Sequence, residues 1–303
     1  MGGEPTLYID EMRQAMSYCH PATSYSLSTN GRLLNDDAVT AFLLDNNVSL
    51  TVSYDGTSGK RGYDNILIHP DYISNLQKFK KLNISTTLDR DNLDLNKLMI
   101  EFGDISNILK RQVRLYPHIM HVTSDKNRPL SLSVQDAHYY ADQWISYVGK
   151  FIQQLNTYGV INLKTLFLFN YLWMCCHNRY EYGETYCFNR NLLKMDTQGN
   201  YYACLYIRDK RTYLGNIAEG KEAALQNMKR LVEELSPGCL ACELYPYCGT
   251  ACIMSQDHHI ECLIQKKILT WFLNEIEKYR LQSFSMIDKL LGGGKNDRPS
   301  VCF

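Results

Sequence analysis

Cysteine spacing constrains this chain more than any other feature of its sequence. The stretch from Cys187 to Cys262 holds seven of the eleven cysteines. Cys187 and Cys204 lie on either side of Gly199 in the pattern C-x11-G-x4-C. Four more follow the pattern C-x2-C-x5-C-x3-C, and one closes the set: Cys239, Cys242, Cys248, Cys252 and Cys262. Thiolates hold iron or zinc when four ligands converge, so seven cysteines indicate nearly two full sites.

Composition indicates why these cysteines are not disulfides. The 303 residues include 32 basic and 32 acidic side chains, which argues against a nucleic-acid or anionic-membrane surface. The amino terminus lacks the basic flank and apolar core of a signal peptide, and no apolar run reaches the roughly 20 residues of a membrane span. We therefore expect a cytoplasmic protein with no nucleic-acid and no membrane partner. Thiols stay reduced in that compartment, so metal binding is predicted.

The first half of the chain predicts an α/β fold. Strand-like segments at Ser24–Ser28, Val48–Ser53, Leu82–Leu88 and Val113–Tyr116 alternate with helical patterns. Such alternation indicates parallel strand pairing with helices packed on the sheet. The predicted helices span residues 9–19, 35–45, 71–81, 92–102 and 134–155.

The pattern changes after Tyr158. An apolar helix is predicted over Leu166–Cys176, followed by a hairpin of Leu192–Met195 and Tyr201–Tyr206 around a turn at residues 197–200. Further helices are predicted over 219–235 and Glu261–Tyr279. They flank a cysteine-rich segment that is expected to form a small α+β domain.

The cysteine pattern resembles the SPASM domain, the carboxy-terminal auxiliary-cluster domain of radical S-adenosylmethionine (SAM) enzymes that modify peptides. The hairpin with Gly199 and Cys204 fits that pattern, as does the Leu-Gly-Asn-Ile sequence at 214–217. The amino-terminal part is similar to the same family: Gly-Gly-Glu-Pro at 2–5 resembles its SAM-binding motif. Ser-Thr-Asn-Gly at 28–31 and Ser-Tyr-Asp-Gly at 53–56 resemble the ends of its third and fourth barrel strands.

The resemblance implies a fold and a domain plan. Residues 1–158 would form an incomplete parallel (β/α) radical SAM partial barrel. Residues 159–282 would form the SPASM domain, and residues 283–303 a flexible tail.

The resemblance also implies two ligand sets. Cys187, Cys204 and Cys252 would hold a first auxiliary 4Fe-4S cluster. A fourth ligand for it could come from Cys176 or Cys175, although two small buried residues on an apolar helix are the simpler interpretation. His258 and His259 are interpreted as part of a solvated loop. The second auxiliary 4Fe-4S cluster would be held by Cys239, Cys242, Cys248 and Cys262.

The resemblance further places SAM contacts at Gly2, Gly3 and Glu4, where glycines allow close backbone approach and a carboxylate can accept hydrogen bonds from an ammonium group. Ser53 and Asp55 follow a strand, at the end where ligands of parallel α/β barrels gather. Alternatively, Gly2, Gly3 and Glu4 belong to an ordinary loop before a helix. Ser53 and Asp55 would then serve only to form a turn, since Asp-Gly is a common turn pair.

One family motif is absent. The C-x3-C-x2-C loop that binds the SAM cluster occurs nowhere in this sequence, and the first two barrel strands would precede residue 2. The chain therefore resembles a truncated member, with SAM and a third 4Fe-4S cluster bound only if the missing region is present. Loss of two strands would expose Ser24–Ser28 as a sheet edge, so we expect the polypeptide alone to be poorly soluble or partly unfolded. A separately encoded amino-terminal piece is the alternative.

These features predict a peptide- or protein-modifying oxidoreductase that also needs an electron donor and is inactive as this chain. The alternatives are a non-catalytic iron–sulfur remnant or partner subunit of a split maturase, and a zinc-stabilised interaction protein. The C-x2-C pair is also typical of structural zinc sites.

Overall fold

The structure is a computed structural model that describes residues 4–278 except 57–65, 112, 123–128, 160–162, 178, 186, 191, 197 and 205–206. Within this part, the chain forms two compact units. Among the described residues, we call those within 4–120 and 150–167 the sheet unit, and those within 121–149 and 168–278 the cysteine unit. The domain boundaries expected from the sequence stay a prediction.

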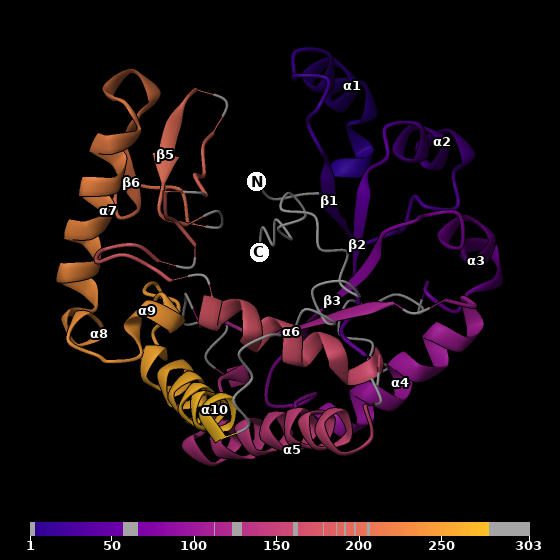
Figure 1. Cartoon of the computed structure of the whole chain (residues 1–303). Helices are drawn as coiled ribbons and strands as arrows, with labels where there is room; N and C mark the ends of the chain where they lie inside the picture. Colours follow the sequence, from indigo (N-terminus) through magenta and orange to yellow (C-terminus); the bar gives the residue numbers. More distant parts are fainter. Residues whose placement is uncertain are drawn as a thin grey trace. The chain divides into compact units, whose positions relative to one another are not determined.

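The sheet unit contains four parallel strands in chain order. They are β1 (Ser26–Thr29), β2 (Ser49–Ser53), β3 (Leu82–Leu88) and β4 (Arg114–Ile119). Figure 1 shows the connecting helices along one side of this sheet: α2 (Asp37–Asp45), α3 (Pro70–Leu76) and α4 (Leu95–Ile108). The predicted α/β fold with parallel pairing is confirmed.

Alternating side chains give the sheet one apolar and one polar face. Leu50, Val52, Leu82 and Ile84 are at most 2% exposed, whereas the residues between them are half-buried. The half-buried set is polar: Thr51, Ser53, Asn83, Ser85 and Thr87. Side chains of a strand alternate between faces, so the apolar set forms a core and the polar set lines the other face.

Replacing Ile84 by alanine is expected to destabilise the protein by about 2–5 kcal/mol, because its side chain is fully buried at the centre of β3. Urea unfolding followed by circular dichroism measures the change. The matched control is Ile100→Ala, since Ile100 is 67% exposed on α4 and should change stability by less than about 0.5 kcal/mol. Equal effects of the two substitutions would contradict this assignment of the core.

β1 lies at the edge of the sheet in the described part of the chain, paired to β2 alone. Its burial is low, with Ser26 and Ser28 exposed. The preceding 3-10 helix η1 (Pro5–Leu7) leads into α1 (Ile9–Ser17), in which no described residue is buried. An edge strand with unpaired backbone groups can accept a further strand.

The cysteine unit is mainly helical. It includes residues 134–149 of α5 (Val134–Tyr158) and most of α6 (Leu163–His177). β5 (Asn200–Tyr202) and β6 (Tyr213–Asn216) form a two-stranded sheet, and α7 (Lys221–Leu235) packs beside it. Two short helices follow α7 in the chain: α8 (Pro237–Leu240) and α9 (Tyr245–Cys248). The chain's last described helix is α10 (His258–Lys278). The sheet and α7 share a small core of Phe188, Tyr201, Ala203, Leu214, Ala224, Met228 and Val232.

Several predicted elements differ from the structure. Residues 192–195 form isolated bridges instead of a strand, and β5 pairs with β6, because Leu214 of β6 is buried in the shared core. α3 ends at Leu76, earlier than predicted, and Phe79 beyond it is 1% exposed. α10 begins at His258, three residues before its predicted start.

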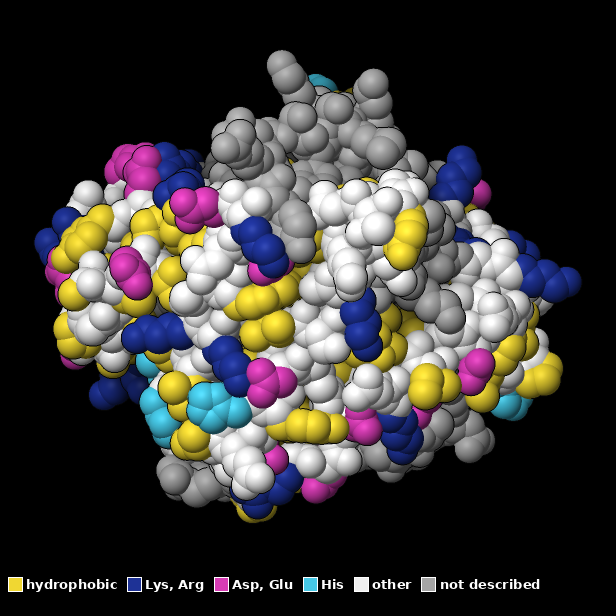
Figure 2. All heavy atoms as spheres, turned by 60° about the horizontal axis from the view of Figure 1, so that its bottom comes forward, with side chains coloured by type: hydrophobic (Ala, Val, Ile, Leu, Met, Phe, Trp, Pro, Cys, Tyr) yellow, Lys and Arg dark blue, Asp and Glu magenta, His cyan; other side chains and the backbone are white. Residues whose placement is uncertain are grey.

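Charges are mixed over the surface. Figure 2 shows acidic and basic side chains interspersed on the face it presents, consistent with the equal numbers of the two kinds. In the part of the chain that the structure describes, no helix is both long enough and apolar enough to cross a membrane.

Candidate functional site: the cysteine groups and the sheet edge

Short turns present the cysteines that follow α7. The Cys242 N–H donates to the Cys239 carbonyl at 3.0 Å, so one turn carries both thiols of the C-x2-C pair. α9 then ends at Cys248, with Gly249 in the left-handed conformation at φ +58°. A Cβ at Gly249 would lie 2.6 Å from ring atoms of Tyr180, so only glycine fits there.

The two cysteines that precede α7, Cys187 and Cys204, adjoin the small core. Cys187 precedes Phe188, whose N–H donates to Thr185, and Cys204 follows Ala203, whose N–H donates to the Thr212 carbonyl at 2.8 Å. Phe188 and Ala203 are buried, so packing of these neighbours holds the two half-buried cysteines in place.

Charge interactions associate Cys252 with the first two cysteines. Burial raises the pKa of the Cys252 thiol, and the negative charges of Glu261, Cys187 and Cys204 raise it further. Neighbouring thiolates repel one another, so removal of the Cys252 proton is unfavourable without a cation. We call Cys187, Cys204 and Cys252 the first group.

A second set of thiols interacts in the same way. Burial raises the pKa of Cys248, as do the charges of Cys175 and of the thiols at 239, 262 and 242. Burial also raises the pKa of Cys239, with further increases from Cys262 and Cys242. We call Cys239, Cys242, Cys248 and Cys262 the second group.

Two side chains from the first turn of α10 hold the main chain of Cys252. Glu261 Oε2 accepts the Cys252 N–H at 3.0 Å, and His258 Nδ1 lies 3.2 Å from the Cys252 carbonyl oxygen. Glu261 is 7% exposed and its other oxygen lies 2.9 Å from His121 Nδ1. Both backbone groups of Cys252 therefore have partners on the helix that carries Cys262.

His258 is a residue that sequence reasoning missed. The expected solvated loop is wrong, because His258 and His259 lie in the first turn of α10. His259 is exposed, whereas His258 is half-buried and its Nε2 lies 3.3 Å from Cys239 Sγ. The spacing His258-x3-Cys262, one helical turn, was the signal that could have identified it.

The two groups fit iron–sulfur clusters in donor chemistry, because each consists of half-buried cysteines and such clusters are held by cysteine thiolates. As the side chains stand, no three His, Cys, Asp or Glu groups of the described residues converge at the distances of one metal ion. Cys175 is buried in α6, where burial and the charge of Cys176 raise its pKa to about 12. Cys176 is half-buried beside it, and burial raises its pKa to about 11.

A second candidate site lies at the carboxyl edge of the parallel sheet. Glu4 Oε1 accepts hydrogen bonds from the Thr6 N–H, the Thr6 hydroxyl and the Thr29 hydroxyl, and Oε2 accepts one from the Asn30 N–H at 2.7 Å. The Glu4 carboxylate thus caps η1 and ties it to the end of β1. The proposed neighbours Gly2 and Gly3 lie outside the described residues.

The ends of β2 and β3 continue this edge. Ser53 ends β2, and Asp55 Oδ1 accepts the Thr87 N–H at 3.3 Å. The Asp55 carbonyl accepts from Asn92 Nδ2 at 3.0 Å. Glu4, Ser53 and Asp55 therefore lie at the edge where ligands of parallel α/β folds bind.

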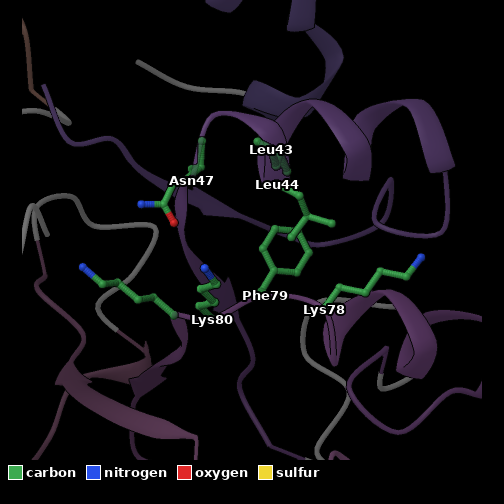
Figure 3. Close-up of a pocket in the computed structure, with 8 residues that line it drawn as sticks. Leu43, Leu44, Asn47, Lys78, Phe79 and Lys80 are labelled. Carbon is green, nitrogen blue, oxygen red and sulfur yellow. The ribbon is translucent and has the colours of Figure 1, made fainter. Parts of the chain in front are cut away.

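The opposite edge carries a hollow of about 220 Å³ with a mixed polar and apolar lining. Figure 3 shows the Phe79 ring beside the two leucines, with Lys78 extending away from Lys80. The amino groups of Lys78 and Lys80 point in different directions and do not converge on a common ligand position. Leu43 and Phe79 belong to the core, so we interpret this hollow as the end of the core. It is lined by Leu43, Leu44, Asn47, Val48, Lys78, Phe79, Lys80 and Lys81.

The His121–Glu261 pair predicts a pH dependence of stability. Burial lowers the pKa of His121, but the hydrogen bond and charge of Glu261 outweigh this and raise it above its usual value of about 6.5. The pair therefore stabilises the fold below about pH 6.5, and this contribution is lost as the pH rises through the elevated folded-state pKa. It is expected to be at most about 1 kcal/mol, because the His121 side chain is 47% exposed.

Urea unfolding of wild type and His121→Gln between pH 5.5 and 8.5 measures this effect. The difference in free energy of unfolding should be largest at the acidic end and shrink with rising pH. A difference that does not change with pH would contradict the ion pair.

Comparisons with known proteins identify the architecture. Three solved structures resemble this chain at 17% identity: histidine-tagged anSMEcpe with bound AdoMet, native anSMEcpe with bound AdoMet, and native anSMEcpe with bound AdoMet and Cp18Cys peptide. Their TM-scores are 0.64, 0.62 and 0.62, and the matches cover 96% of this chain and 82%, 84% and 85% of those chains. The chain therefore shares the fold of these three structures. No protein-family model and no curated protein matches the sequence.

At this level of identity the likeness concerns the fold. The shared fold agrees with the partial parallel barrel expected from the sequence, because the described sheet has four parallel strands with β1 at its edge.

Proposed function

We propose that this chain is a radical SAM/SPASM-type protein of peptide or protein modification whose cysteine unit binds two auxiliary 4Fe-4S clusters. The feature that carries the proposal is that the charges of Cys187 and Cys204 raise the pKa of Cys252, whereas those of Cys239, Cys242 and Cys262 raise the pKa of Cys248. The first group, Cys187, Cys204 and Cys252, ligates one cluster, for which Cys176 is the candidate fourth ligand. The second group, Cys239, Cys242, Cys248 and Cys262, ligates the other.

The residues around the thiols prepare them for this role. Burial and like charges disfavour lone thiolates at Cys248 and Cys252, so a cationic centre binds in exchange for their protons. Glu261 and His258 orient Cys252 through its main chain. A bound cluster supplies electron transfer or ligates a substrate group, and the electron donor is a separate partner.

We assign SAM binding to the carboxyl edge of the sheet, through Gly2, Gly3, Glu4, Ser53 and Asp55. Support comes from the position of Glu4 and Asp55 at strand ends and from the AdoMet bound in the structures with this fold. One of those structures also holds a peptide, which supports a peptide or protein substrate.

The polypeptide of this sequence is proposed to be inactive on its own. It contains no C-x3-C-x2-C motif, so the third cluster that would activate SAM has no ligands here. In the described part of the chain β1 pairs with β2 alone, which supports a separate amino-terminal piece that adds further strands in the active protein. The second candidate function follows from the same absent motif: a non-catalytic iron–sulfur subunit of a split maturase.

Metal analysis after anaerobic purification tests the proposal. We expect iron and acid-labile sulfide in equal amounts, approaching about eight of each per chain for two 4Fe-4S clusters. Zinc without sulfide would contradict it and favour a zinc-stabilised interaction protein. Incubation with SAM and dithionite then separates the two candidates: 5′-deoxyadenosine formed by this chain alone would overturn the proposed inactivity.

A further inference from the structure

Glu261 is a buried carboxylate whose two oxygens both have partners. It lies in the first turn of α10 and is 7% exposed. Oε2 accepts the Cys252 N–H at 3.0 Å, and Oε1 lies 2.9 Å from His121 Nδ1. Among the described residues, no lysine or arginine pairs with this carboxylate. The fold therefore holds a negative charge next to the main chain of a first-group cysteine.

The hydrogen bond to Cys252 does not by itself require this charge. The side-chain oxygen of a glutamine, which has the same length, can accept the same N–H. A buried carboxylate costs more free energy to desolvate than a buried amide does. The charge of Glu261 therefore has an electrostatic effect on its surroundings that the hydrogen bond alone would not have.

This contact has two consequences for a cluster held by Cys252. The reduction potential of an iron–sulfur cluster depends on its net charge and on hydrogen bonds to its sulfurs. Because the Cys252 N–H donates to Glu261, it is not available to a sulfur of the cluster. Adding an electron beside a fixed negative charge is also unfavourable, and this repulsion is stronger in a partly desolvated site than in water. Both effects lower the reduction potential.

The position of Glu261 on α10 directs these effects to one group. Cys262 of the second group is the next residue, but successive side chains on a helix point about 100° apart. In the described part of the chain, the Glu261 side chain bonds to Cys252 and His121. The carboxylate is therefore bonded to a residue of the first group and to none of the second.

We propose that Glu261, acting through Cys252, lowers the reduction potential of the cluster held by the first group. It is a positioning residue, which fixes the main chain of one ligand and places a negative charge beside it. The inference rests on the first cluster of the proposed function, and it concerns the potential of that cluster. A stronger electron donor is then needed to reduce it.

Redox titration of the anaerobically reconstituted full chain, followed by electron paramagnetic resonance of the reduced cluster, tests the inference. The parent is Cys248→Ser, which is expected to keep only the first cluster. The titration is run at pH 8.5, where the ion pair with His121 contributes least. Glu261→Gln keeps the hydrogen-bond acceptor and removes the charge, so the iron content should equal that of the parent. Reduction should become at least tenfold more favourable, which for one electron is a shift of about 59 mV to higher potential.

Two further variants separate the charge from the hydrogen bond. Glu243→Gln is the matched control, because Glu243 is exposed and follows Cys242; it should change the equilibrium constant for reduction by less than about twofold. Glu261→Leu removes both the charge and the acceptor. It should lower the iron content, since the Cys252 N–H loses its partner.

Three results would overturn the inference: an unchanged potential in Glu261→Gln, an equal shift in Glu243→Gln, or loss of the cluster in Glu261→Gln. In the last case the carboxylate would be needed only to hold Cys252. A wild-type chain that takes up no iron and sulfide would contradict the proposed function itself. A cluster-bearing chain whose potential does not depend on Glu261 would contradict this inference alone.

Discussion

Replacing Cys252 by serine is expected to remove about half of the iron and acid-labile sulfide from the anaerobically purified protein. Cys252 is the member of the first group whose thiol interacts with both others. A 4Fe-4S cluster needs thiolate ligands, so loss of one from a group of three should abolish that cluster and leave the other. Iron and sulfide assays, with the visible absorbance of the clusters, measure the loss.

Cys19→Ser is the matched control for this experiment. Cys19 is exposed after α1 in the sheet unit and belongs to neither group, so its replacement should leave the iron content unchanged. Equal iron in wild type and Cys252→Ser would contradict the ligand assignment. Equal losses in the two variants would show that the effect is not specific to the first group.

Replacing Phe272 by alanine is expected to destabilise the cysteine unit by about 3–5 kcal/mol. Phe272 is fully buried on α10, and its ring meets that of Phe169 of α6 edge to face, with centroids 5.5 Å apart. The substitution removes this aromatic contact and leaves a cavity beside the helix that carries Cys262. All three tryptophans, Trp144, Trp173 and Trp271, lie in this unit, so urea unfolding followed by tryptophan fluorescence reports on it directly.

Phe272→Leu is the control, since it keeps most of the apolar volume and should cost less than about half as much. The alanine variant should also take up less iron, because α10 positions Cys262 and holds Cys252 through Glu261. A loss below about 1 kcal/mol for Phe272→Ala would contradict the packing of α10 on α6.

Most elements of the sheet unit could be predicted from the sequence. β3 has the predicted bounds, Leu82–Leu88, because buried and half-buried side chains alternate over its whole length, with Thr86 as the polar member of the buried set. Its neighbours agree within a few residues for the same reason. The order of the strands was not stated in advance, although alternation with helices predicted that they pair in parallel.

The cysteine unit was less predictable. The segment 192–195 has strand-like composition but forms only bridges, because β6 offers β5 a longer partner and a buried Leu214. Cluster ligation and SAM contacts were inferred by resemblance and stay predictions. His258 was misjudged because the family's cysteine pattern does not need it, and its distance from Cys239 along the chain conceals the contact.

The sequence by itself determined three features: thiols at ligand spacing, strands alternating with helices, and the absence of a C-x3-C-x2-C motif. These are local properties, because each depends only on the spacing of residues that are close along the chain. Only the tertiary structure decided which thiols interact and what surrounds them. The effect of the Cys187 and Cys204 charges on the pKa of Cys252, the Glu261 and His258 contacts to its main chain, and the approach of His258 to Cys239 depend on tertiary packing, which no short stretch of sequence encodes.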